Sequence, residues 1–76
     1  MDNAEWRMHI RAGVAYGAEN TCGVKIDWRS EARAVTAAAR MSEKTGRDLE
    51  AYPCAFCTGW HIGRRMTAEE RKEFAS

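Results

Sequence analysis

Two cysteines and a histidine lie within eight residues of one another, in the arrangement Cys54-x2-Cys57-x3-His61. At that spacing both thiolates can bind one ion while the backbone N–H groups between them turn toward the sulfurs, and the histidine is near enough to join them. The remaining cysteine, Cys22, is the natural fourth ligand, and His9 is its rival for that position. Three cysteines and one histidine form a closed, tetrahedral structural zinc arrangement. The sequence therefore predicts a structural Zn²⁺ site at Cys22, Cys54, Cys57 and His61.

The small size of the chain favours such a metal site. Its 76 residues suffice for one small domain, 1–76, and thirteen of the residues that make up its 45% hydrophobic fraction are alanines. A core that small stabilises a fold only marginally without a staple. Three cysteines are an odd number for a disulfide framework, and the sequence shows no signal peptide or membrane-spanning stretch. We therefore expect a cytoplasmic protein with no membrane partner and a metal staple, although free cysteines also serve as small buried hydrophobes.

Three catalytic interpretations of the same segment fail. A zinc deaminase needs an upstream His-x-Glu, whereas His9 is followed by Ile10 and Arg11. A thioredoxin-like dithiol needs a βαβ context, and c-type haem attachment needs histidine where Thr58 stands. No carboxylate pair, nucleophile or open metal position can be assembled. We expect no enzymatic activity and no small-molecule substrate.

The fold class predicted by patterning is α+β. An alternation of apolar residues from Trp6 to Tyr16, and again from Cys22 through Val24 to Ile26, predicts an N-terminal β-hairpin over roughly residues 5–26. In that hairpin His9 falls on the polar face and would be solvated. A second hairpin is expected around the cysteine pair, with one strand ending at Pro53 and another over residues 59–63.

Two helices complete the predicted fold. The first spans about 28–45, with Asp27 or Ser30 as N-cap and Gly46 as C-cap. Its apolar stripe is expected to be Trp28, Ala32, Val35 and Ala39. The second, about 68–75, begins with a capping box formed by Thr67 and Glu70, and Phe74 is its expected anchor.

Basic residues follow one side of the first helix. The net charge is only +1, so overall charge indicates no partner, but local clustering can. The cations that share this arc are Arg29, Arg33, Arg40, Lys44 and Arg47, and Arg64 and Arg65 could extend it. We expect this face to contact the phosphates of DNA or RNA. The alternatives are an ordinary solvated face, or a protein–protein interaction module that inhibits a host complex through an N-terminal strand edge or exposed Trp6 and Phe56.

The segment Tyr52-Pro-Cys-Ala-Phe-Cys-Thr-Gly-Trp-His-Ile62, of the form Y-x-C-x-x-C-x-G-W-H-[IL], resembles a group of short zinc-finger-like proteins. These proteins are encoded by actinobacteria and their phages, and most are uncharacterised. An earlier cysteine with a nearby lysine and an alanine-rich helix also belong to the pattern, and Cys22, Lys25 and residues 32–39 match that order. The resemblance covers about residues 22–64. Members commonly have Cys-Pro and Gly-Gly where this chain has Cys54-Ala55 and Thr58-Gly59, departures that spare the ligands. The resemblance implies zinc and a compact αββ core, without a settled function.

Overall fold

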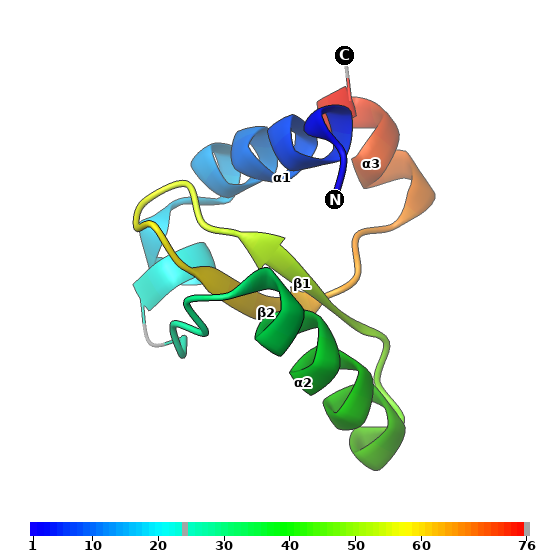
Figure 1. Cartoon of the computed structure of the whole chain (residues 1–76). Helices are drawn as coiled ribbons and strands as arrows, with labels where there is room; N and C mark the ends of the chain where they lie inside the picture. The colour runs from blue at the N-terminus through cyan, green and yellow to red at the C-terminus, as the bar shows by residue number, and fades with distance from the viewer. Residues whose placement is uncertain (24, 76) are drawn as a thin grey trace.

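The computed structural model describes residues 1–23 and 25–75, and it shows a small α+β fold in three layers (Figure 1). A two-stranded antiparallel sheet, β1 (Leu49–Pro53) and β2 (Trp60–Arg64), forms the middle layer. Helix α2 (Glu31–Thr45) covers one face, and α1 (Asn3–Tyr16) with α3 (Ala68–Ala75) lies over the other. A short π-helical turn, η1 (Glu19–Gly23), follows α1. The predicted α+β class is confirmed.

The strand register divides the sheet residues between the two outer layers. Ala51 pairs with Ile62, and both belong to the apolar cluster beneath α2. The alternate pair, Tyr52 with His61, faces the opposite layer because neighbouring side chains in a strand point to opposite faces. The sheet thus supplies one face for the core and another for polar and aromatic side chains.

Helix α2 has the predicted caps but a rotated apolar face. The hydroxyl of Ser30 accepts a hydrogen bond from the Arg33 N–H at 3.3 Å, and Gly46 has the left-handed φ of 73°. The helix begins at residue 31 rather than 28 because Arg29 adopts a positive φ of 58° and its N–H bonds the Asp27 carboxylate at 2.9 Å. That turn cannot be part of a right-handed helix.

The predicted stripe of α2 (Trp28, Ala32, Val35, Ala39) is wrong within the helix itself, although Trp28, which precedes the helix, does pack against the core. Ala34 and Ala38 are the buried residues of α2, whereas Ala32, Val35 and Ala39 are exposed. Alanines occur on several sides of this helix, so their spacing did not single out one face. The rotation is fixed by Ser42, whose hydroxyl both accepts from the Leu49 N–H at 2.9 Å and donates to the Leu49 carbonyl at 3.3 Å.

The predicted N-terminal hairpin is also wrong, because residues 3–16 form α1. Asp2 caps the helix by accepting a hydrogen bond from the Glu5 N–H at 2.8 Å. Met8 and Ala12 fit both an alternating and a helical pattern, and Met66 and Phe74 pack against them. The helical alternative wins because it buries that pair against α3 while satisfying its own backbone hydrogen bonds. The proposed second strand is replaced in part by η1, and Val24 lies outside the described residues.

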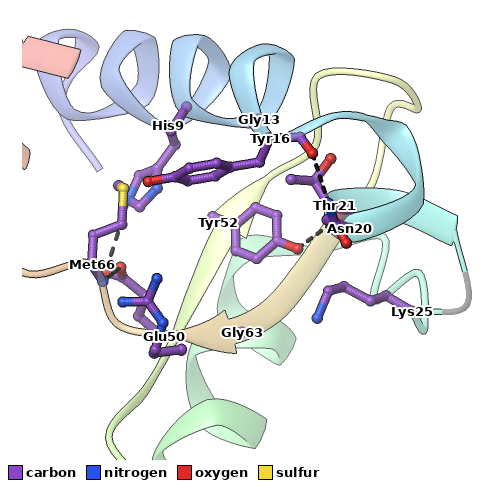
Figure 2. Close-up of a pocket in the computed structure, with 12 residues that line it drawn as sticks. His9, Gly13, Tyr16, Asn20, Thr21, Lys25, Glu50, Tyr52, Gly63 and Met66 are labelled. Atoms are coloured by element: carbon purple, nitrogen blue, oxygen red, sulfur yellow. Dashed lines mark hydrogen bonds and ion pairs between the residues drawn. The ribbon is translucent and has the colours of Figure 1, made fainter. Parts of the chain in front are cut away.

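His9 and Gly13 acquire new roles from this change. His9 is buried at 5% exposure beneath α1, next to Tyr52, rather than solvated (Figure 2). A Cβ on Gly13 would lie 3.4 Å from the Cβ of Ala55. The backbone of α1 at Gly13 therefore lies close to the loop that carries the cysteine pair, at a distance that a Cβ would turn into an ordinary contact.

Helix α3 agrees with its prediction. The Thr67 hydroxyl accepts from the Glu70 N–H at 3.1 Å, and the Glu70 carboxylate accepts from the Thr67 N–H at 2.9 Å, which completes the capping box. Phe74 anchors the helix against the α1 cluster and meets Tyr16 edge-on at 5.6 Å. None of the helices in the described part of the chain combines the length and apolar character that crossing a bilayer requires.

Candidate metal centre

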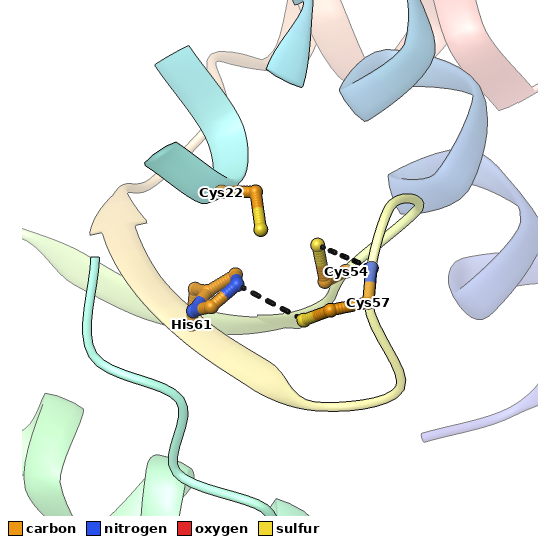
Figure 3. A group of neighbouring side chains, drawn as sticks. All are labelled: Cys22, Cys54, Cys57 and His61. Atoms are coloured by element: carbon orange, nitrogen blue, oxygen red, sulfur yellow. Dashed lines mark hydrogen bonds between the residues drawn. The ribbon is translucent and has the colours of Figure 1, made fainter. Parts of the chain in front are cut away.

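Three thiols and one imidazole converge at one end of the sheet (Figure 3). Cys22 comes from η1, Cys54 follows β1, Cys57 lies in the connecting loop, and His61 is on β2. Their ligand atoms all lie within 4.8 Å of one another. A tetrahedral zinc site with Zn–S of ~2.3 Å requires sulfurs ~3.8 Å apart, and Cys57 Sγ is 3.5 Å from His61 Nε2. The four predicted ligands form a candidate metal centre.

The loop between the strands directs its N–H groups at sulfur. Cys54 Sγ accepts from the N–H groups of Phe56 and Cys57, both at 3.3 Å, and Cys57 Sγ accepts from Gly59 at 3.4 Å. The Cys54 N–H bonds the Gly59 carbonyl at 3.0 Å and closes the turn. Such donors stabilise thiolates in preference to thiols.

Gly59 lies directly against the segment that leads into α2. A Cβ at this position would overlap the carboxylate of Asp27, which caps the Arg29 N–H. The Trp28 N–H donates to the Trp60 carbonyl at 3.0 Å beside this contact. The metal loop and the start of α2 are therefore packed against each other, so ordering one orders the other.

His61 is the most deeply buried ligand, at 1% exposure. Its Nδ1 lies 2.6 Å from the carbonyl oxygen of Ile26, so Nδ1 carries the proton and donates a hydrogen bond to that oxygen. The Nε2 lone pair then points toward the sulfurs. A hydrogen bond from the second ring nitrogen is the usual device that orients a metal-binding histidine.

Cys22 is positioned by the geometry of η1. The Thr21 N–H and hydroxyl both donate to the Gly17 carbonyl, at 3.1 and 2.8 Å. The Tyr52 hydroxyl in turn donates to the Thr21 carbonyl at 2.7 Å, which ties η1 to β1. Tyr52 thus holds Cys22 over the cysteine pair, a role that the sequence pattern did not indicate.

The thiols differ in acidity. Burial of Cys54 opposes its ionisation, but N–H donation from Phe56 and Cys57 outweighs this and lowers the pKa of Cys54 to about 7. The hydrogen bond to Cys54, followed by desolvation, raises the pKa of Cys22 to about 11. Neighbouring thiolates repel one another, so full ionisation of the group requires a cation among them. The arrangement is chemically suited to a soft divalent ion.

His9, the rival fourth ligand, lies outside this group. Its Nε2 is 3.9 Å from the Glu50 carboxylate. Glu50, which sequence reasoning missed, is buried and accepts from the Met66 N–H at 2.9 Å and from Arg71 at 2.6 Å. A carboxylate in mid-strand that pairs with an arginine 21 residues later in the chain has no recognisable pattern in the sequence.

The predicted basic residues fall into two groups. Arg29, Arg33, Arg40, Lys44 and Arg47 are all exposed, and three of them (33, 40 and 44) lie within α2. Among the described residues, no ion pair involves Arg33, Arg40, Lys44 or Arg47. Arg64, by contrast, makes a two-pronged contact with Glu70 at 2.9 and 3.1 Å, and Arg65 bonds Asp48 at 2.9 Å. The α2 cations are free to meet an external anion, whereas Arg64 and Arg65 are already neutralised.

Comparisons with protein-family models, with curated proteins and with solved structures find no match to this chain.

Proposed function

We propose that Cys22, Cys54, Cys57 and His61 bind one structural Zn²⁺ ion in a cytoplasmic, non-enzymatic module that binds DNA or RNA. Thiolate and imidazole donors favour zinc over hard cations, which prefer oxygen. Because protein side chains fill all four tetrahedral positions, no site is left for substrate or water. The resemblance to short zinc-finger-like proteins supports the same metal.

The observation that carries nucleic-acid binding is a group of cations on α2 that form no ion pair with any residue the structure describes, namely Arg33, Arg40 and Lys44 (hereafter the α2 cations). Seven residues separate the two arginines, which places them ~10.5 Å apart along the helix axis. Both border a shallow groove that also includes Trp28, Thr36 and Met41. Cations at the rim and an aromatic side chain within the groove suit a phosphate backbone with a base beside it.

The test measures binding of zinc-loaded protein to single- and double-stranded oligonucleotides by mobility shift over a range of salt concentrations. Changing Arg33 and Arg40 to glutamine should weaken binding and reduce the slope of log K against log[salt] by about 1.4 for single strands or about 1.8 for duplex DNA. Arg64→Gln should leave that slope unchanged because Glu70 already neutralises the arginine.

A matched charge control is available on another layer of the fold. Arg40→Glu and Arg7→Glu change net charge equally, and Arg7 is exposed on α1, across the sheet from α2. Equal loss of affinity in the two variants, or salt-independent binding, would contradict the proposed interface. The zinc content of each variant separates loss of contact from loss of fold.

Exposed aromatic side chains favour a second candidate, a protein-interaction module such as a phage-encoded or regulatory inhibitor of a host complex. Trp6 is 45% exposed and Phe56, in the metal loop, is 46% exposed. The N-terminal strand edge that was expected to pair with a partner is instead helix α1. The partner would therefore bind through the exposed Trp6 and Phe56. This second candidate predicts that a partner is retained from nuclease-treated lysate and lost with Phe56→Ser.

A further inference from the structure

A cavity of about 340 Å³ separates α1 and η1 from the face of the sheet opposite α2 (Figure 2). This volume is about twice the ~150 Å³ that accommodates benzene in an engineered protein cavity, and it lies within the range of natural ligand pockets. Tyr52 lies in the middle of the cavity, between His9 and Lys25 (Figure 2). The walls therefore offer an aromatic surface between two nitrogen-bearing side chains.

The polar atom at one end of the cavity has no partner within the described residues. His9 is 5% exposed, and its Nε2 makes no hydrogen bond there. The nearest acidic atom, Glu50 Oε1 at 3.9 Å, is too distant, and Glu50 is engaged by Arg71 and the Met66 N–H. A buried polar atom without a partner costs ~1–3 kcal/mol. A ligand with a hydrogen-bonding group at this end would remove that cost.

The opposite end of the cavity carries a positive charge. Lys25 is half-buried, and its Nζ donates to the Ile62 carbonyl at 3.3 Å. Within the described part of the chain no ion pair includes Lys25, whereas Arg64, the other cation lining the cavity, is paired with Glu70. A single ammonium without a counter-charge in a partly enclosed site favours a monoanion.

Gly63 keeps the space between these groups open. A Cβ on Gly63 would lie 3.3 Å from Tyr52 Cε1 and 3.7 Å from Lys25 Nζ. The Tyr52 ring and the Lys25 ammonium therefore lie close together above Gly63, which has no side chain. A flat ligand can pack on the Tyr52 ring while an anionic group attached to it reaches the Lys25 ammonium.

From this arrangement we propose that the cavity binds a small aromatic monocarboxylate. Its carboxylate pairs with Lys25, its ring packs on Tyr52, and a hydrogen-bonding group at its far end meets His9 Nε2. This ligand site is independent of the α2 cations and of nucleic acid, and α1 forms one of its walls.

The test is a titration of ¹⁵N-labelled, zinc-loaded protein with 4-hydroxybenzoate, benzoate and uncharged benzamide, followed by backbone amide shifts. We expect saturable shifts at Gly13 and Gly63, with 4-hydroxybenzoate binding more tightly than benzoate. Lys25→Met should weaken binding at least tenfold, roughly the loss of one charge-assisted hydrogen bond. The matched variant Lys44→Met, exposed on α2, should bind as wild type.

Two further comparisons keep the proposal testable if Lys25→Met does not fold. Benzamide should bind the wild type at least tenfold more weakly than benzoate, and His9→Phe should remove the preference for 4-hydroxybenzoate. Absence of saturable shifts with all three probes would show that the cavity holds water only. If Lys25→Met and Lys44→Met weaken binding equally, the ligand is held by the general surface charge and not by the cavity. Either this result or the absence of saturable shifts overturns the proposal.

Discussion

The buried carboxylate of Glu50 connects the sheet with α3 and with the segment that leads into it, and its removal should be more costly than the loss of any exposed acid. Glu50 is 8% exposed and bonds Arg71 of α3 at 2.6 Å and the Met66 N–H at 2.9 Å, with His9 of α1 nearby. Glu50→Gln retains an oxygen for the Met66 N–H but removes the negative charge. Arg71 then remains without its closest counter-charge.

The size of the effect follows from the exposure of the pair. Removing one partner of a fully buried ion pair costs ~3–5 kcal/mol. The Arg71 side chain is 29% exposed, so water can partly solvate the guanidinium left behind. We therefore expect a loss of about 2–3 kcal/mol. A chain of this length is stable by only ~4–11 kcal/mol, so this is a large fraction of the total.

The assay is urea unfolding followed by circular dichroism, at one fixed concentration of free zinc because metal binding contributes to apparent stability. Glu43→Gln is the matched control, since Glu43 is exposed on α2 and such surface changes usually stay within ~0.5 kcal/mol. If the two variants unfold at the same urea concentration, Glu50 does not hold the layers together.

Two other predictions concern the metal loop and pH. Gly59→Ala forces the Asp27 carboxylate away from the Arg29 N–H and should lower stability by about 1–2 kcal/mol. The loss is measured as a lower melting temperature. An unchanged melting temperature would contradict the packing of the metal loop against the start of α2. Hydrogen bonding to Glu70 raises the pKa of Tyr16 to about 12, and burial raises the pKa of Tyr52. A raised phenol pKa stabilises the fold below pH ~10 and loses that contribution as pH rises further, so phenolate absorbance should appear only above pH 10 and together with loss of stability. Half-ionisation of either tyrosine near pH 10 would contradict this.

Local signals predicted the parts of the fold that local interactions determine. The capping box at Thr67 and Glu70 and the caps of α2 satisfy backbone groups within a few residues, so sequence spacing was sufficient. The Cys54–His61 spacing and the single remaining cysteine likewise identified four side chains that the fold brings together.

The errors arose where tertiary contacts decided between two patterns. Met8 and Ala12 fit both a strand and a helix, and the contact with Met66 and Phe74 selects the helix. The rotation of α2 depends on the Ser42 contact with Leu49, which periodicity does not report. The cavity beside His9 could not be predicted because His9 was placed on a solvated strand.

We propose that one zinc ion at Cys22, Cys54, Cys57 and His61 organises this fold. Structural zinc contributes ~10–16 kcal/mol in small peptides near neutral pH, which exceeds what a core of this size supplies. Purified protein should contain one zinc per chain by native mass spectrometry, and Cys22→Ser should lower the affinity while His9→Gln leaves it unchanged.

The most direct measurement is the far-ultraviolet circular dichroism of the protein before and after addition of a strong chelator under reducing conditions. We expect the helical signal to be lost as the metal is removed and to return when one equivalent of zinc is added. A spectrum that stays unchanged while mass spectrometry shows the metal gone would contradict it.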